Sequence, residues 1–473
     1  MRVAILGGGI AGLSAAYELE LARRRGSGTD YVLFEASPRL GGVISSQVAN
    51  GCVLEHGPDS FLTEKPAALE LCRELGLESD LIPSNDTERK TFILVRNRLI
   101  ALPDGLMFLV PTKLVPAALT PLFSLGTKLR MALEYFKPVR PGFGDESVAD
   151  LVRRHYGQEV VDRLADPLLS GIYGGDATQL SAQSVLPRLV QMEAQYGSLT
   201  RGMLASRKNM QTAQHTQKTS SAAPRPIFTT LRGGLRQMID VLAAQLEPSR
   251  IRCSTTVRSI TRGASGWQLS LSETELRGSA VEDFDAVIVA TPAWAAAQFL
   301  GGSHPALSAE LDGIPYSSSI TMNLVFDEAF LGQLPEGFGF LVPAVERRAI
   351  LACTFVHRKF PGRTAPGKAV LRVFLGGARN EPLLAESDDA LTGIVREELR
   401  QMLGIAAQPE LVQVRRWRRA MAQYAVGHAG RQQRIRAHLE TLPGLHLVGN
   451  AYDGIGIADC IRLGRQAARA TQK

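Results

Sequence analysis

A glycine-rich turn between an apolar strand and an apolar helix opens the sequence and constrains its fold most. Residues 3–6 (VAIL) run into GGGIAG, in which Gly7, Gly9 and Gly12 match G-x-G-x-x-G. The first glycine makes a tight turn, the second admits a pyrophosphate and the third lets helix and strand pack closely. A second apolar strand ends in Glu35, about 20 residues on, where a carboxylate accepts from ribose hydroxyls. Residues 2–35 therefore predict a dinucleotide-binding βαβ unit.

A second glycine pair follows this unit and indicates which dinucleotide binds. Arg39, Gly41 and Gly42 would bring a cation and bare backbone to the same pyrophosphate. This extension resembles the flavin amine oxidase and desaturase superfamily rather than nicotinamide dehydrogenases. The sequence has no second G-x-G-x-x-G, so we expect no separate NAD(P)H domain, and oxygen or a quinone as electron acceptor.

The tail of the sequence has a second strand–turn–helix pattern. Bare backbone in its turn would let a flat ring approach, and the helix start would stabilise negative charge on a reduced flavin. The predicted contacts are Gly449, Gly454, Ile455, Gly456 and Ile457. A glycine-rich hairpin is the alternative, but head and tail meeting around one non-covalent FAD explains both motifs.

The rest of the chain predicts a mixed α/β fold of two or three domains, because 473 residues exceed one compact core. A helix is expected over 388–403, between the N-cap Ser387 and Gly404. The other expected segments are a short helix over 64–76, helices within 92–204, a mobile loop over 206–226, and strands within 250–290 and 318–376.

Charge and cysteine usage limit the class of partner and compartment. The net charge of +7 suits anionic partners. Four arginines around Trp417 lack a nucleic-acid-binding module, so a solvated strand or helix edge is expected there, with no nucleic acid bound. Five cysteines without C-x-x-C, and eight histidines without ligand spacing, predict neither a disulfide framework nor a metal site. A strand beginning beside Met1 leaves no room for a presequence, so a cytoplasmic location is expected.

The most apolar stretch, residues 106–125, contains Lys113 and the helix-breaking Pro111, Pro116 and Pro121. A spanning helix is therefore not expected. We expect at most a peripheral contact with the cytoplasmic membrane.

Five motifs together resemble the flavin-dependent protoporphyrinogen and coproporphyrinogen III oxidases along essentially the whole chain. They are the G-x-G-x-x-G head with R-L-G-G, residues 55–61 (EHGPDSF), 170–176 (SGIYGGD), 337–343 (GFGFLVP) and the tail 449–461. The resemblance implies three interleaved parts: an FAD domain (1–85, 228–300, 430–473), a β-sheet substrate domain (86–100, 205–227, 301–429) and a helical, membrane-facing domain (101–204).

The resemblance also implies site residues. It places Leu341, Thr354 and Phe374 on the tetrapyrrole pocket, although Thr354 departs from the aliphatic residue expected there. Further substrate contacts are expected at Asp59, Gly171 and Gly175, and a further FAD contact at Val257. His56 is the only histidine to consider as a base, and a packed or solvated histidine is favoured. No dedicated catalytic residue is expected.

The implied reaction converts a porphyrinogen to the porphyrin of haem synthesis by three successive hydride transfers to flavin, with oxygen as acceptor. The basic chain favours coproporphyrinogen over protoporphyrinogen slightly, and a homodimer is left open. The alternatives are an amine oxidase, a carotenoid desaturase, or a non-catalytic lipid carrier of the same fold.

Overall fold

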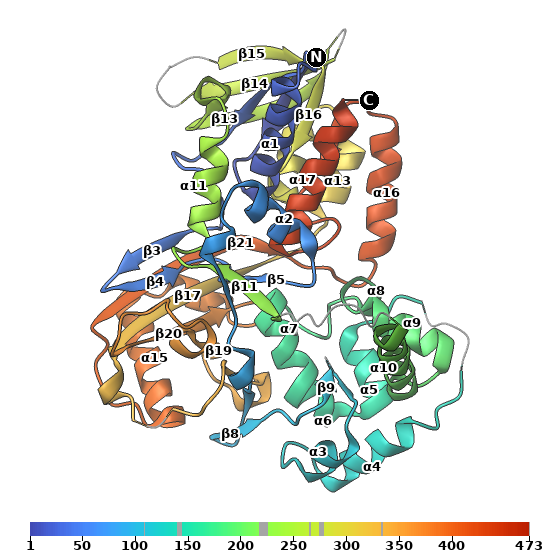
Figure 1. Cartoon of the computed structure of the whole chain (residues 1–473). Coiled ribbons are helices and arrows are strands. Elements are labelled where there is room, and N and C mark those ends of the chain that lie inside the picture. Colours follow the sequence, from blue (N-terminus) through green and yellow to red (C-terminus); the bar gives the residue numbers. More distant parts are fainter. Residues whose placement is uncertain are drawn as a thin grey trace.

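The computed structural model describes residues 1–107, 109–139, 144–216, 226–263, 266–273, 279–332 and 334–472. Figure 1 shows a parallel sheet with helices at the top, where both termini lie, a mostly antiparallel sheet at the lower left and a group of helices at the lower right. The expected mixed α/β fold is confirmed.

The upper part is built on a five-stranded parallel sheet with the strand order β12-β2-β1-β16-β22. The predicted strand–helix–strand unit is confirmed, with α1 between β1 and β2. The bounds are β1 Arg2–Leu6, α1 Ile10–Arg24, β2 Asp30–Phe34, β12 Ile251–Arg252, β16 Ala286–Val289 and β22 Leu445–Leu447.

Both faces of this sheet are buried, which explains why its strands are continuously apolar. Val3 and Ile5 pack in one core with α1 and with α2 (Pro66–Glu74), α11 (Arg236–Ala244) and α17 (Ile457–Thr471). Ala4 and Leu6 pack in a second core. That core contains β13 (Thr255–Arg262), β14 (Trp267–Glu273), β15 (Ser279–Phe284), α12 (Ala293–Leu300), α13 (Pro305–Asp312) and α16 (His428–Glu440).

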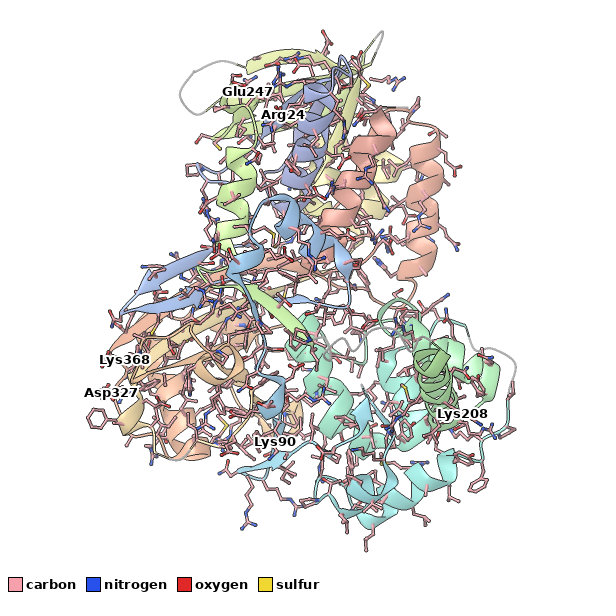
Figure 2. All side chains as sticks on the ribbon, viewed as in Figure 1. Arg24, Lys90, Lys208, Glu247, Asp327 and Lys368 are labelled. Atoms are coloured by element: carbon pink, nitrogen blue, oxygen red, sulfur yellow. The ribbon has the colours of Figure 1, made fainter. Side chains whose placement is uncertain are left out.

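The lower-left part is a seven-stranded sheet with the order β21-β17-β20-β19-β18-β7-β8. Its strands are β7 Thr91–Val95, β8 Arg98–Ala101, β17 Tyr316–Asp327, β18 Gly339–Leu341, β19 Ile350–Phe355, β20 Lys368–Gly376 and β21 Leu411–Ala422. Asp327 and Lys368 are opposite each other in the register of β17 and β20, at the left of Figure 2. β21 is an edge strand, which confirms the strand-edge interpretation of its arginines.

One face of this sheet packs against α15 (Asp388–Leu403) in a shared core. The predicted ends of α15 are confirmed: Ser387 Oγ accepts from the Ala390 N–H at 3.1 Å, and Gly404 has φ 71°. The smaller elements are β3 Ser46–Ala49, β4 Cys52–Glu55, β5 Phe61–Leu62, β6 Leu81–Pro83, β9 Leu106–Met107, β10 Val110–Pro111, β11 Phe228–Leu231 and α14 Val356–Lys359.

The lower-right part is helical: α3 Leu114–Leu119, α4 Leu125–Glu134, α5 Val148–Tyr156, α6 Gln158–Val160, α7 Asp166–Tyr173, α8 Ala182–Val185, α9 Pro187–Tyr196 and α10 Leu199–Thr216. The expected loop over 206–226 is wrong for residues 206–216, which belong to α10; residues 217–225 lie outside the described part. Glu134 starts α10 by accepting from the N–H groups of Leu199 and Thr200, so a tertiary contact overrides weak local apolarity. In the described part of the chain, no helix combines the length and apolarity needed to cross a bilayer.

Candidate active site

The glycine turn after β1 has the geometry that its three glycines predict. Gly7 has φ 105°, which favours glycine. A β-carbon at Gly12 would lie 1.9 Å from the Gly7 carbonyl oxygen, so α1 packs directly on the turn. A β-carbon at Gly9 would meet nothing within 4 Å, so open space lies over the start of α1.

Glu35 is held beside this turn at the end of β2. Its Oε2 accepts from the Gly8 N–H at 2.7 Å and its Oε1 from the Ser37 N–H at 2.8 Å. Thr255 N–H donates to the Glu35 carbonyl oxygen at 3.0 Å, which brings the start of β13 to the same end of β2. Val257, two residues along β13, is buried in the second core. Contacts of Glu35 and Val257 with FAD stay predictions.

The R-L-G-G loop lies against the first turn. The Gly41 N–H donates to the Gly8 carbonyl at 2.8 Å, and a β-carbon at Gly42 would lie 3.4 Å from the Gly9 α-carbon. Arg39 donates to the Gly42 carbonyl at 2.7 Å. Burial, with the nearby cations of Arg236 and Arg415, lowers the pKa of Arg39. Positive charge thus gathers where two glycine loops meet, as a pyrophosphate requires.

The tail brings a second helix start to the same edge of the sheet. A β-carbon at Gly464 of α17 would lie 2.1 Å from the Ala11 carbonyl of α1, so the two helices are in contact, as Figure 1 shows. From that contact, α17 runs back seven residues to its start at Ile457, whereas α1 runs back only one to Ile10. The start of α17 therefore lies six residues further along, or about 9 Å at 1.5 Å per residue. The start of α17 is therefore displaced from the start of α1, as a ring at one end of a dinucleotide requires.

The glycines of the tail differ in what surrounds them. A β-carbon at Gly449 would meet nothing within 4 Å, but one at Gly454 would lie 2.3 Å from Asp459 Cγ. The open approach expected at Gly454 is therefore filled by Asp459, whose Oδ2 accepts from the Gly456 N–H at 3.2 Å and caps α17. Ile455 and Ile457 flank Gly456 in this turn. The sequence reasoning missed Tyr424, whose hydroxyl accepts from the Gly454 N–H and donates to the Asn450 carbonyl, both at 3.0 Å.

The three residues expected on the substrate pocket share one face of the seven-stranded sheet. Phe374 is opposite Ala352, which is opposite Leu341. Thr354 lies two residues from Ala352 on β19, and alternate residues of a strand point to the same face. This face is opposite the one covered by α15, so Leu341, Thr354 and Phe374 are brought together.

Helix α7 lies against this face. A β-carbon at Gly171 would lie 3.1 Å from Leu341 Cδ2, and the neighbouring Ile172 is 54% exposed. Gly175 is different: it is buried, and a β-carbon there would lie 2.2 Å from Gln423 Oε1. Gly171 thus packs on Leu341 with the exposed, apolar Ile172 next to it on α7, whereas Gly175 serves the packing of the turn after α7.

Asp59 lies beside this face between two cations that the sequence reasoning missed. Lys359 Nζ lies 3.0 Å and Arg372 Nη1 3.3 Å from Asp59 Oδ2. Burial alone would raise the pKa of Asp59, but Lys359 and Arg372 hold it well below its usual range. The Arg372 guanidinium lies 4.7 Å from the Phe374 ring centroid, so the cluster adjoins the substrate face with one positive charge in excess.

His56 is a packed histidine, as favoured. It is 2% exposed, with Nδ1 3.1 Å from Ser45 Oγ and Nε2 2.9 Å from Gln413 Oε1. Burial lowers its pKa. With both ring nitrogens engaged, His56 is poorly placed to take a substrate proton.

The comparisons agree with this geometry. The model of the flavin containing amine oxidoreductases matches residues 10–471. A coproporphyrinogen III oxidase of Bacillus subtilis (strain 168) is 36% identical over 98% of this chain and 97% of its own. Protoporphyrinogen oxidase 2 of Arabidopsis thaliana is 27% identical over 99% and 93%. A crystal structure of a candidate protoporphyrinogen oxidase from Exiguobacterium sp. 255-15 is 32% identical, covers 100% and 98%, and has a TM-score of 0.86.

The fold and the site define a dinucleotide-binding flavoprotein. The chain belongs to the flavin containing amine oxidoreductase family and, within it, to the coproporphyrinogen III and protoporphyrinogen oxidases. The cofactor is FAD. The residues present fit it: space is open over Gly9, arginines surround the meeting point of two glycine loops, and a second helix starts about 9 Å further along.

Proposed function

We propose that this chain oxidises a porphyrinogen, coproporphyrinogen III or protoporphyrinogen IX, to the porphyrin. One observation supports this proposal most. Leu341 and Phe374 on the sheet and the exposed Ile172 on α7 form an apolar surface, and the positively charged Asp59 cluster lies beside it. A tetrapyrrole carries an apolar ring and anionic propionates, and these two surfaces match those two parts. The names of the relatives support the same substrate class.

When bound, FAD supplies a two-electron acceptor that can take a hydride from an electron-rich bridging carbon. The protein's own residues would then hold the macrocycle: Leu341 and Phe374 would support one ring face, and the exposed Ile172 of the adjoining α7 would limit its sideways movement. Pyrrole protons leave to solvent, because His56 is fully hydrogen-bonded. Oxygen is the proposed final acceptor, and three such oxidations complete the product.

We further propose coproporphyrinogen, with four propionates, as the better of the two substrates. The excess positive charge at Asp59, Lys359 and Arg372, and the chain's net charge of +7, favour the more anionic substrate. Oxygen uptake measured on both porphyrinogens with the same yellow enzyme tests this. A higher kcat/KM for coproporphyrinogen is expected; a higher value for protoporphyrinogen would reverse the assignment, and uptake with neither would overturn the function.

FAD is proposed to be held without a covalent bond, by contacts with the glycine turns and the other predicted cofactor residues. Heat precipitation of the protein should leave all the yellow colour in the supernatant; flavin remaining on the precipitated chain would contradict it. We also propose that the chain forms three interleaved domains with these predicted boundaries. We propose a cytoplasmic location as well.

A peripheral membrane contact is proposed for α3 and α4. Leu125, Leu129 and Leu133 recur every four residues along α4 and are 82%, 62% and 59% exposed, and Phe136 beyond them is 73% exposed. Val115 and Leu119 on α3 are 68% and 77% exposed. Lys113, Lys128 and Arg130 are close to these residues in the sequence, so an anionic lipid surface is the occupant that both properties fit.

Flotation with vesicles containing phosphatidylglycerol tests this contact. Leu125→Ser with Leu129→Ser should lower the bound fraction, whereas Val281→Ser, at an exposed valine on β15, should not. Equal flotation of all three proteins would contradict the assignment. Binding that neither high salt nor mild detergent reverses would contradict a peripheral contact.

A further inference from the structure

Arg379 joins the two elements that form the walls of the proposed substrate cleft. It follows β20, the strand of Phe374, after a short turn. Its Nη1 lies 2.8 Å from Asp166 Oδ2 at the start of α7, and its Nη2 2.6 Å from Asp176 Oδ1 just beyond the end of α7. Its Nε donates to Asp176 Oδ2 at 3.0 Å, so the Asp176 contact is bidentate.

The backbone repeats this connection. The Ala378 N–H donates to the Gly174 carbonyl at 3.0 Å, and a β-carbon at Gly377 would lie 3.2 Å from the same oxygen. The turn after β20 therefore lies directly on the turn after α7. The Arg379 guanidinium therefore binds carboxylates at both ends of α7, the helix that carries Gly171 and Ile172.

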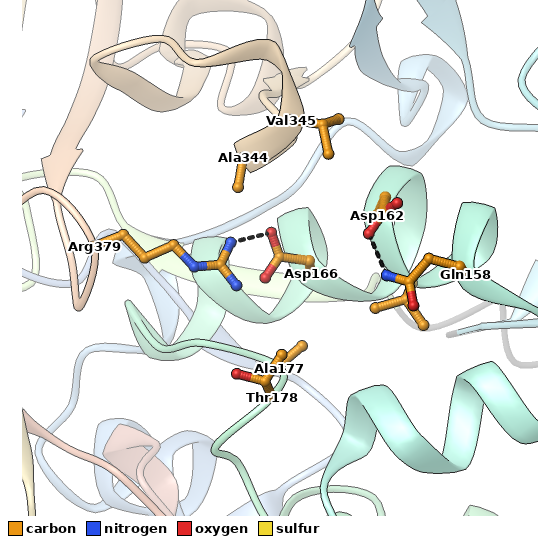
Figure 3. A pocket seen from close by; sticks show the side chains of 9 residues that line it. Gln158, Asp162, Asp166, Ala177, Thr178, Ala344, Val345 and Arg379 are labelled. Atoms are coloured by element: carbon orange, nitrogen blue, oxygen red, sulfur yellow. Dashed lines mark hydrogen bonds and ion pairs between the residues drawn. The ribbon is translucent and has the colours of Figure 1, made fainter.

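Beside Arg379 the contact between sheet and helices is hollow. A cavity of about 260 Å³ lies between the Ala344–Val345 turn and the helices, and Asp166 and Arg379 both line it, as Figure 3 shows. The π-helical turn Val161–Ala165, which precedes α7, lines it too. Gly171 packs closely on Leu341, but tight packing is missing at this end of the contact, where the ion pairs of Arg379 connect α7 to the sheet instead.

The carboxylates of these pairs are less exposed than those of ordinary surface ion pairs. Asp166 is 5% exposed, and burial raises its pKa while Arg379 opposes that rise. Burial would also raise the pKa of Asp176, but its bonds to Arg379 lower it. A carboxylate that is buried depends on its partner, whereas exposed pairs contribute little.

We propose that Arg379 is a positioning residue for porphyrinogen oxidation, which acts by holding the α7 wall at the correct distance from Leu341 and Phe374. This inference rests on the proposed function and extends it to a residue outside the cleft. Loosening α7 should mainly weaken the grip on the macrocycle. A shift of about 1 Å in a positioning element can cost about 100-fold in rate, so its effect on substrate handling is measurable.

The test compares four proteins with the wild-type holoenzyme. Arg379→Gln breaks both pairs, Arg379→Lys keeps a cation, and Arg379→Gln with Asp166→Asn also removes the buried unpaired carboxylate, so that folding is preserved. Arg400→Gln, in an exposed ion pair with Glu397 on α15, is the matched control. KM and kcat for coproporphyrinogen, FAD content and backbone amide exchange over residues 166–178 are measured for each.

We expect KM to rise about 10- to 100-fold in Arg379→Gln and in the double variant, with FAD content unchanged, and by less in Arg379→Lys. Amide exchange over 166–178 should accelerate in Arg379→Gln and in the double variant, and Arg400→Gln should match the wild type in KM and in exchange. Wild-type KM in the double variant would overturn the positioning role. If the wild type oxidises no porphyrinogen, the proposed function fails, and unchanged exchange in Arg379→Gln would separately overturn the connection itself.

Discussion

The parallel sheet and the seven-stranded sheet build their halves of the site in opposite ways. At the parallel sheet, short local motifs form the cofactor site. Their glycines leave space for the cofactor because they carry no side chain, as at Gly9. At the seven-stranded sheet, the cleft comes from distant segments joined by charges: Asp59 meets Lys359, and Arg379 meets Asp166. A cofactor common to many enzymes can thus be encoded locally, whereas a particular substrate needs tertiary assembly.

The largest effect is expected at Gly9, in the part of the site that local motifs encode. Gly9→Val should yield apoprotein, because the new side chain would fill the space open to the pyrophosphate. Gly393→Val on α15 is the control, since a β-carbon there would also meet nothing within 4 Å. Flavin absorbance per chain measures the result, and normal flavin content in Gly9→Val would contradict the assignment of this turn.

The second prediction concerns the cleft. Phe374→Ala and Leu341→Ala should each lower kcat/KM by about 10- to 100-fold, because the macrocycle loses its support, while FAD content stays normal. Phe330→Ala, at a phenylalanine that is 70% exposed, should have no effect. Loss of flavin in the cleft variants would show that the two halves are not separable as described.

The local motifs were predictable and the cleft contacts were not, for a physical reason. The head, the capped helix 388–403 and the shared face of Leu341, Thr354 and Phe374 follow from motif, cap or resemblance. Lys359, Arg372 and Tyr424 carry no local signal, because their partners are far away in the sequence. The same reason explains the error over 206–216: α10 starts on Glu134, a residue that no window around 206 contains.

The stability of the FAD-binding part at low pH should depend on His428, a residue outside the glycine motifs. His428 stacks on Tyr424 at 4.1 Å, and burial lowers its pKa to about 4. An unfolded histidine titrates near 6.5, so the unfolded state binds the extra proton first as pH falls. Stability is therefore complete above about pH 6.5 and declines toward pH 4, by up to about 3 kcal/mol.

Melting temperatures between these pH values measure this decline. His428→Phe keeps an aromatic stack without a titratable nitrogen, so its melting temperature should fall less steeply as the pH falls. His438→Phe, on the same helix, should keep the wild-type slope. An unchanged slope in His428→Phe would show that this histidine does not link the tail turn to acid stability.

The smallest effect is expected at His56. A true general base contributes about 10²- to 10⁴-fold, whereas His56 is occupied by Ser45 and Gln413. His56→Ala should therefore lower kcat by less than about 10-fold once variants of equal FAD content are compared. If His56→Ala abolishes turnover while Phe374→Ala leaves it intact, positioning is not the basis of catalysis and a histidine base must replace it.

A porphyrinogen bound on the sheet face should deliver its electrons to the flavin held at the glycine turns. The most direct measurement is anaerobic mixing of the yellow holoenzyme with coproporphyrinogen III, followed by visible absorbance. We expect rapid loss of flavin absorbance, recovery on admitting oxygen, and a loss about 10- to 100-fold slower in Phe374→Ala. Flavin that stays oxidised with porphyrinogen present, but is reduced by a simple amine, would contradict it.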